Sequence, residues 1–266
     1  MNKGSVPIAQ LISLKGRTAL VTGSAVGIGR AIAQRYAEAG CELDLVDIDK
    51  DGLLKLKGEL SQTGTEVEVH EVDISKKEEI DALWKELKGS PPDILVNNAG
   101  IYPFKDFLEV DEALLKRTMD INFSSVFWMC QKMIESRINK GGVIINVGSI
   151  EAILPFKDAL AHYGPSKAGV IALSRALARD YGKKGFRVNV LLPGGIVTPG
   201  TKRAAEGILR MEFGLVKSGV EFRARLPLGR FGDPDEVARM ALVLASDLSS
   251  YVSGALIAVD GGFLSA

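Results

Sequence analysis

Short apolar runs rich in β-branched residues alternate along the chain with longer segments whose apolar positions recur at helical spacing. Runs that are apolar almost throughout are typical of parallel strands buried on both faces. Strands joined by helices cross over right-handedly, so the alternation predicts one doubly wound α/β sheet with helices on both faces. We expect seven strands, at 18–22, 43–46, 67–72, 94–96, 143–147, 187–192 and 255–259, and helices at 27–39, 53–60, 76–87, 112–138, 163–181 and 235–245.

No linker, repeat or shift of composition divides the 266 residues, a length that fits one large domain spanning 1–266. Residues 1–14 form an extension before the first strand. Two stretches interrupt the alternation, a loop at 150–162 and an insertion at 199–232. Both follow carboxyl ends of strands, where open α/β sheets bind ligands, so we expect them to line the substrate site.

The composition excludes several classes of function. The 33 basic and 33 acidic residues balance, which leaves no electrostatic footprint for nucleic acid or an anionic membrane. Two cysteines and two histidines, far apart in sequence, are too few for a disulfide framework or a metal site. No apolar stretch reaches the length of a membrane span, and no signal-peptide cleavage site follows the amino end. We therefore expect a cytoplasmic protein with a small-molecule partner and no metal.

A glycine-rich turn, TGSAVGIG at 22–29, joins the first strand to a helix. Glycines let a pyrophosphate approach the helix amino terminus, whose free N–H groups favour an anion, although a tight turn without a ligand has the same pattern. The acidic Asp47, followed by Ile48, ends the second strand, which is the context a dinucleotide site requires. Its carboxylate can accept hydrogen bonds from ribose hydroxyls and would repel the 2′-phosphate of NADP; alternatively it caps the next helix.

Tyr163 and Lys167 stand four residues apart at the start of a helix, so both side chains lie on one face. A phenol is a poor base at neutral pH, and a nearby ammonium lowers its pKa. Ser149, at the end of the fifth strand, can hold a substrate oxygen beside the phenol. Singly, these residues are typical of a half-buried tyrosine, a solvated lysine and a capping serine. Their order after a nucleotide-binding pattern favours proton transfer coupled to hydride transfer.

From about residue 15 to 263 the sequence resembles the short-chain dehydrogenase/reductase family. The matching motifs are TGSAVGIG, NNAG at 97–100, Asn122 within MDINF, Ser149, YGPSK at 163–167, PGGIVT at 193–198 and VSGALIAVDGG at 252–262. The resemblance implies a seven-stranded Rossmann-type sheet, a nicotinamide cofactor and frequently a homotetramer. If the oligomer follows the family, the final strand and the helix 235–245 lie at a subunit interface.

The resemblance also implies roles for individual residues. Tyr163 would be the general acid/base, Lys167 would lower its pKa and bind the nicotinamide ribose, Ser149 would orient the reacting oxygen, and Asn122 would hold a water that links Lys167 to solvent. Substrate contacts are expected from Ser149, Tyr163 and Glu151. The cofactor contacts expected are Gly23, Ser24, Gly27, Ile28, Gly29, Asp47, Ile48, Asp73, Ile74, Asn98, Gly100, Tyr163, Lys167, Pro193, Gly194, Ile196 and Thr198.

Two departures from the family pattern matter. Ser149 and Tyr163 are fourteen residues apart, one more than the commonest spacing, so we expect the loop 150–162 to bulge. NADP-preferring relatives often carry a basic residue where this chain has Val26, which together with Asp47 favours NAD. The leading hypothesis is an NAD-dependent dehydrogenase of a secondary alcohol or ketone. The alternatives are an NADP-dependent 3-oxoacyl thioester reductase and, from another class, a non-catalytic nucleotide-binding sensor.

The substrate cannot be named from the sequence, but the expected pocket wall is mostly apolar. Glu151 and His162 are its polar candidates. Glu151 either bonds a substrate hydroxyl, as suits a sugar or polyol, or is a solvent-facing loop acid. His162 either faces the pocket or packs beside the helix start. Arginines of the insertion either meet an anionic substrate or lie on a surface helix. The apolar wall is expected from Tyr102, Phe104, Ile150, Leu154 and Gly195, and the arginines are Arg203, Arg210, Arg223 and Arg225.

Overall fold

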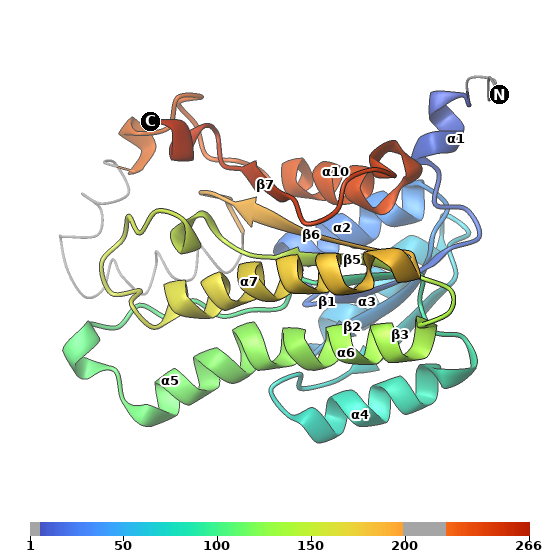
Figure 1. The fold of residues 1–266 in the computed structure, drawn as a ribbon, viewed down its shortest axis with the longest axis horizontal. Helices are drawn as coiled ribbons and strands as arrows, with labels where there is room; N and C mark the ends of the chain where they lie inside the picture. The colour runs from blue at the N-terminus through green and yellow to red at the C-terminus, as the bar shows by residue number, and fades with distance from the viewer. Residues whose placement is uncertain (1–5, 199–221) are drawn as a thin grey trace.

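The seven apolar runs form seven strands that pair in parallel, in the order β3-β2-β1-β4-β5-β6-β7 (Figure 1). The computed structural model describes residues 6–198 and 222–266. The doubly wound sheet expected from the sequence is thereby confirmed, and each expected strand is present. The strands are β1 (Thr18–Thr22), β2 (Glu42–Asp47), β3 (Val67–Glu71), β4 (Ile94–Asn97), β5 (Gly142–Val147), β6 (Phe186–Pro193) and β7 (Leu256–Val259).

Helices cover both faces of the sheet, because successive strand residues point to opposite sides and both sets are apolar (Figure 1). Val21 of β1 lies in the core beneath one helix layer and its neighbour Leu20 in the core beneath the other. The first layer is α2 (Gly27–Glu38), α3 (Lys50–Ser61) and α10 (Pro234–Ala245), and the second is α4 (Lys77–Glu86), α6 (Ser125–Arg137) and α7 (Tyr163–Tyr181). The short 3-10 turns are η1 (Leu87–Gly89), η2 (Phe107–Glu109), η4 (Ile150–Ala152), η5 (Gly182–Lys184), η6 (Asp247–Ser249) and η7 (Phe263–Ser265).

Two helical segments differ from the sequence prediction. The expected helix 112–138 is interrupted: α5 (Glu112–Met119) is followed by a π-helical turn, η3 (Asp120–Ser124), before α6 begins. The π turn widens the helix where Asn122 bonds to the backbone of Ile101, a tertiary contact that the periodicity could not reveal. A short helix, α1 (Ile8–Ile12), also forms in the amino-terminal extension.

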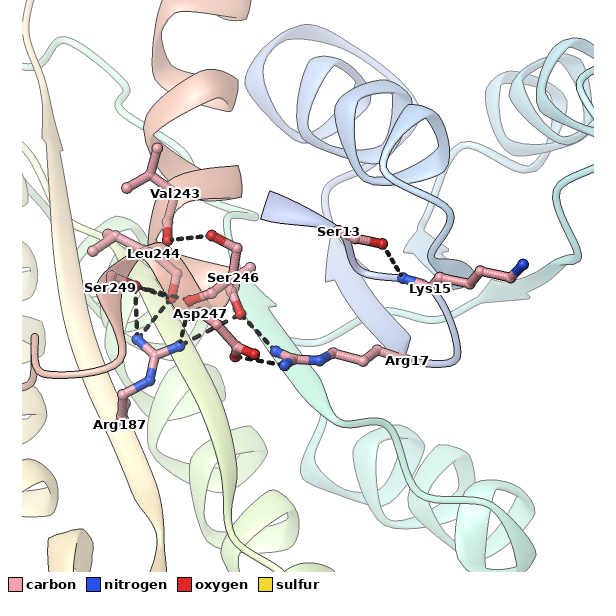
Figure 2. A network of polar contacts seen from close by, with 10 residues as sticks. Ser13, Lys15, Arg17, Arg187, Val243, Leu244, Ser246, Asp247 and Ser249 are labelled. Atoms are coloured by element: carbon pink, nitrogen blue, oxygen red, sulfur yellow. Dashed lines mark hydrogen bonds and ion pairs between the residues drawn. The ribbon is translucent and has the colours of Figure 1, made fainter. Parts of the chain in front are cut away.

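Two arginines hold the carboxyl end of α10 against the sheet (Figure 2). The guanidinium of Arg187, on β6, donates to the carbonyl oxygens of Leu244 (2.8 Å) and Ser246 (3.2 Å) and to the Ser249 hydroxyl (2.9 Å). Arg17 donates to the Ala245 carbonyl at 3.1 Å. Cationic donors thus satisfy the free carbonyls of the helix end and complement the negative end of its dipole.

The carboxyl-terminal residues close over the loop 150–162 through aromatic rings. Phe263 is fully buried and lies 4.6 Å from Phe222 and 4.8 Å from Phe156, measured between ring centroids. Within the loop, Ala159 has a φ of 65°, a left-handed conformation unusual for a residue with a Cβ. Of the insertion expected at 199–232, residues 199–221 lie outside the described residues. Among described helices, none combines the length and apolar character needed to span a bilayer.

Candidate active site

The carboxyl ends of β1, β2, β4, β5 and β6 meet at one edge of the sheet, and the expected site residues follow these ends. Adjacent parallel strands run in register, so segments far apart in sequence reach this edge together. The amino terminus of α7 adds Tyr163 and Lys167 from the second helix layer. The geometry has two parts, a glycine-rich turn after β1 and a proton-transfer group around α7.

The turn after β1 accepts only glycine at its critical points. Gly23 and Gly27 have φ values of +65° and +62°. A Cβ on Gly29 would lie 2.2 Å from the carbonyl oxygen of Gly23, far inside contact distance. Val26, the N-cap residue directly before α2, makes no side-chain hydrogen bond to the amino end of the helix. A close-packed turn with uncapped N–H groups fits the pyrophosphate of a dinucleotide. Of the other contacts expected here, Ser24 is buried and donates to the Val46 carbonyl (3.3 Å), while Ile28 is half-buried.

Asn98 holds this turn in place with its side chain. Its Nδ2 donates to the carbonyl oxygens of Thr22 (2.9 Å) and Gly23 (3.0 Å), and its backbone N–H donates to the Thr22 hydroxyl at 3.0 Å. The amide thus supports the glycine-rich backbone instead of pointing a free donor at a ligand. Thr22 was missed as a supporting residue, although its place directly before Gly23 at a strand end was a usable signal.

The carboxylate of Asp47 is tied to the same turn. One oxygen accepts from the N–H of Ala25 at 3.0 Å and the other from the N–H of Asp49 at 3.1 Å. The cap of α3 itself is Asp49, whose side chain accepts from Gly52; the alternative of a capping Asp47 holds only for the turn before the helix, where Asp47 accepts from the N–H of Asp49. Ile48 is 68% exposed beside it. The Asp47 carboxylate is therefore fixed next to the glycine-rich turn.

Asp73 and Ile74, at the end of β3, use their side chains locally. The Asp73 carboxylate accepts from the N–H (3.0 Å) and the hydroxyl (2.7 Å) of Ser75, and these bonds hold its pKa below the ordinary value. The side chain of Ile74 is buried in the core. A cofactor contact of Ile74 is therefore left to its backbone, whereas the Asp73 side chain is still 37% exposed.

The end of β6 approaches the glycine-rich turn. A Cβ on Gly27 would lie 3.4 Å from the side chain of Thr198, so the two segments touch. Ile196 is buried and forms a bridge with Gly232. Pro193 is buried at the strand end, and a Cβ on Gly194 would meet Asp260 at 2.7 Å. The expected contacts from β6 thus lie on the far side of the site from Asp47.

The Ser149 hydroxyl lies close enough to the Tyr163 phenol for a hydrogen-bonding interaction that lowers the pKa of the phenol. Burial raises the pKa of the Tyr163 phenol to about 12, and the Ser149 bond opposes that rise. Ser149 also caps η4, accepting from the N–H of Glu151 at 3.2 Å. The serine hydroxyl and the phenol therefore form one polar pair at the carboxyl end of β5, where a reacting oxygen could be held by both.

Lys167 is buried one turn further along α7 and donates to the carbonyl oxygen of Val147 at 2.9 Å. Burial lowers the pKa of its amine to about 8. That Lys167 lowers the pKa of the Tyr163 phenol stays a prediction; burial, which raises that pKa, is the largest influence on the phenol. A Cβ on Gly100 would lie 3.3 Å from the Lys167 amine, so glycine there leaves the amine open on the side of β4.

Asn122 is fully buried, and its side-chain amide is committed within the protein. Its oxygen accepts from the N–H of Ile101 (2.9 Å), and its Nδ2 donates to the Ile101 carbonyl (2.8 Å) and to the Ser166 hydroxyl (3.2 Å). Ser166 in turn donates to the Tyr163 carbonyl at 2.7 Å. Asn122 thus locks the segment after β4 to the first turn of α7. Ser166, missed as a positioning residue, was present in the YGPSK motif.

Glu151 does not face solvent, so that alternative is wrong. Its side chain is buried, and burial raises its pKa, while the nearby backbone of Phe156 and Lys157 opposes that rise. His162 is also buried, with Nε2 against the Pro103 carbonyl at 2.9 Å.

Of the expected arginines, Arg225 lies over the ring of Phe263 at 4.7 Å and the exposed Arg223 donates to a backbone carbonyl. Arg203 and Arg210 lie outside the described residues. The expected apolar wall is present, with Ile150 buried, Leu154 packed beside it, Tyr102 against Phe104 and Gly195 beneath Phe222.

Comparisons with known proteins match this geometry. The family model described as enoyl-(acyl carrier protein) reductase matches residues 23–264. Galactitol 2-dehydrogenase (L-tagatose-forming) of Cereibacter sphaeroides is 37% identical over 254 residues, covering 94% of this chain and 96% of that protein. The 3-oxoacyl-(acyl-carrier-protein) reductase FabG of Thermotoga maritima is 34% identical over 254 residues, covering 94% and 99%. A solved putative NAD(P)-dependent gluconate 5-dehydrogenase from Beutenbergia cavernae, with bound NADP, superposes with a TM-score of 0.88 at 33% identity, covering 96% and 100%.

Proposed function

Since the chain belongs to the short-chain dehydrogenase/reductase family and is an oxidoreductase acting on CH–OH groups, we propose that it oxidises a secondary alcohol, or reduces the corresponding ketone, with NAD(H). The observation that carries the proposal is the proximity of the Ser149 hydroxyl to the Tyr163 phenol, with Lys167 buried one turn further along α7. A module that only senses a nucleotide has no use for a buried amine whose burial carries a cost in stability.

The bound nicotinamide supplies the hydride acceptor or donor. In oxidation, Tyr163 acts as the phenolate, and its oxygen takes the proton of the substrate hydroxyl; in reduction, the neutral phenol donates its proton to the carbonyl oxygen of the substrate. Ser149 holds the substrate oxygen beside the phenol and supports the phenolate through its hydrogen bond. Below about pH 8, Lys167 carries a positive charge one helical turn away, which opposes the effect of burial on Tyr163. Asn122 and Ser166 keep the first turn of α7 in register with the segment after β4.

Preference for NAD over NADP is proposed from Asp47. Its carboxylate is anchored by two backbone N–H groups beside the glycine-rich turn, so it cannot easily move away from a 2′-phosphate. A fixed negative charge at this place accepts hydrogen bonds from ribose hydroxyls and repels a phosphate. The family itself admits either cofactor, since the Beutenbergia cavernae protein binds NADP.

The test is nicotinamide absorbance with NAD and NADP against sugars, cyclic alcohols, linear secondary alcohols and 3-hydroxyacyl thioesters. Turnover of an alcohol with NAD supports the proposal. Turnover of the thioester alone, with NADP, would make the chain a 3-oxoacyl thioester reductase, like the FabG relative. Binding of nicotinamide nucleotides without any turnover would support the alternative of a non-catalytic nucleotide-binding sensor.

We also propose a homotetramer with β7 and α10 at a subunit interface. β7 is the last strand in the sheet order, and its residues are half-buried or exposed. An uncovered edge strand is a natural place for a second chain to pair or pack. Light scattering tests this: a mass of four chains supports it, and a monomer contradicts it. A cytoplasmic location stays a prediction.

A further inference from the structure

Three polar side-chain atoms around Tyr163 are buried and have no hydrogen-bond partner: Tyr102 Oη, Glu151 Oε2 and His162 Nδ1. The rings of Tyr102 and Tyr163 meet edge to face with centroids 6.2 Å apart. Glu151 lies two residues after Ser149, and His162 directly precedes Tyr163. Buried polar atoms are normally paired, so three orphans around one reactive phenol point to a ligand that supplies their partners.

The loop and its neighbours hold these three groups in fixed positions. The Glu151 side chain is buried with the backbone of Phe156 and Lys157 nearby, and its Oε2 has no hydrogen-bond partner. The ring of Tyr102 is held edge to face by Phe104 at 5.9 Å as well as by Tyr163. His162 Nε2 faces the carbonyl oxygen of Pro103 at 2.9 Å, so Nε2 carries the proton and Nδ1 is an acceptor.

The chemistry of these three unpaired atoms defines which ligand groups can bond to them. Glu151 Oε2 and His162 Nδ1 accept hydrogen bonds, and the Tyr102 hydroxyl both donates and accepts. Hydroxyl groups next to the reacting carbinol would satisfy all three. A hydrocarbon chain or a thioester has no donors to offer there and would leave the acceptors buried and unpaired, which is costly.

The charges of the loop favour a neutral ligand over an anionic one. Lys157, the lysine of the loop 150–162, has its ammonium over the ring of Phe104 at 4.5 Å and interacts electrostatically with Glu151. The carboxyl group of Glu151 would repel the carboxylate of a sugar acid placed against it.

We propose that Glu151, Tyr102 and His162 bind hydroxyl groups next to the reacting carbon and select neutral polyhydroxylated substrates, namely sugars or polyols. The inference rests on the proposed function, because it places these hydroxyls beside the carbinol that Tyr163 deprotonates. The Tyr102 ring lies edge to face with the Tyr163 ring at 6.2 Å between centroids, and Glu151 acts electrostatically on the Tyr163 phenol.

The test compares kcat/KM for cyclohexanol, 1,2-cyclohexanediol, myo-inositol and a 3-hydroxybutyryl thioester in four proteins: wild type, Tyr102→Phe, Glu151→Gln and Asp158→Asn. Tyr102→Phe keeps the ring and removes only the orphan hydroxyl. Glu151→Gln keeps one acceptor for the backbone of the loop. Asp158 is an exposed acid on the same loop and serves as the matched control. Thermal unfolding of each variant verifies that it is folded.

We expect wild type to prefer the diol or myo-inositol over cyclohexanol by at least about tenfold, and each site variant to lower that ratio by at least about fivefold, as loss of one hydrogen bond implies. Asp158→Asn should keep the wild-type ratio. Turnover of cyclohexanol or of the thioester without a preference for added hydroxyls overturns this inference and leaves the oxidoreductase intact. The inference also fails if folded site variants keep the wild-type ratio. No turnover of any substrate with either cofactor contradicts the proposed function itself.

Discussion

The amine of Lys167 donates a hydrogen bond to the carbonyl oxygen of Val147, the last residue of β5, at 2.9 Å. This bond ties the helix that carries Tyr163 to the strand that ends just before Ser149. The amine is buried there, and burial lowers its pKa from the ordinary 10.5 to about 8. Lys167 is therefore held in place at a cost in folding stability.

Lys167→Met should stabilise the protein near neutral pH. Below about pH 8 the buried charge of Lys167 lowers the free energy of unfolding of wild type by about 3 kcal/mol. The variant removes this penalty but loses one hydrogen bond, which contributes roughly 1 kcal/mol, so its free energy of unfolding should be higher by about 2 kcal/mol. Between the folded and unfolded pKa values the unfolded chain binds more protons, so wild-type stability rises with pH and the gain shrinks. Denaturant unfolding at about pH 7 and about pH 10 measures this. A variant less stable than wild type at neutral pH would mean that the Val147 bond outweighs burial.

Asp47→Asn should weaken the preference for NAD. The amide keeps the shape and loses the negative charge that opposes a 2′-phosphate, so the ratio of kcat/KM with NAD to that with NADP should fall at least about tenfold, or roughly 1.4 kcal/mol. Asp49→Ser, which retains a cap for α3, is the control and should keep the wild-type ratio. A wild type that prefers NADP, or a ratio that Asp47→Asn leaves unchanged, contradicts the role given to this carboxylate.

Gly29→Ala should damage the cofactor turn. The new Cβ would lie 2.2 Å from the Gly23 carbonyl oxygen and 2.5 Å from Asn98 Nδ2, so the turn must shift. We expect a loss of about 2 kcal/mol in the free energy of unfolding and weaker NADH binding in a fluorescence titration. Gly58 lies on the exposed face of α3, and a new Cβ there would have no atom within 4 Å. Gly58→Ala should therefore raise the free energy of unfolding by about 0.5–1 kcal/mol. Equal effects of the two substitutions would show that the turn tolerates a side chain.

Arg187→Lys should lower the free energy of unfolding by about 2 kcal/mol, because an ammonium cannot reproduce the forked hydrogen bonds to the end of α10 (Figure 2). Arg179→Lys is the matched control: Arg179 is 81% exposed and pairs only with its neighbour Asp180 among the bonds described, so its change should stay within about 0.5 kcal/mol. Denaturant unfolding of both variants measures the two changes in the free energy of unfolding. If the two arginines were equivalent, the network at the carboxyl end of α10 would contribute nothing measurable.

The sequence was sufficient for the sheet, because near-continuous apolar runs mark strands covered on both faces whatever the loops do. It was insufficient where a distant contact decides the local structure. The π turn at Asn122 depends on the backbone of Ile101, and helical periodicity carries no trace of that contact. The burial of Glu151 depends on how Phe156 and Lys157 fold back over it. Likewise, the Tyr-x-x-x-Lys spacing placed Lys167 correctly, but only the packed structure shows that burial governs the pKa of both groups.

The most direct test of the account compares wild type with Tyr163→Phe for oxidation of a secondary alcohol, with NADH binding measured in parallel. The substitution removes one oxygen atom, the one assigned to proton transfer and bonded to Ser149. We predict that kcat/KM falls about 10²–10⁴-fold, the usual contribution of a general acid/base, while NADH still binds. Turnover by Tyr163→Phe at the wild-type rate would contradict the assignment of this phenol and, with it, the proposed mechanism.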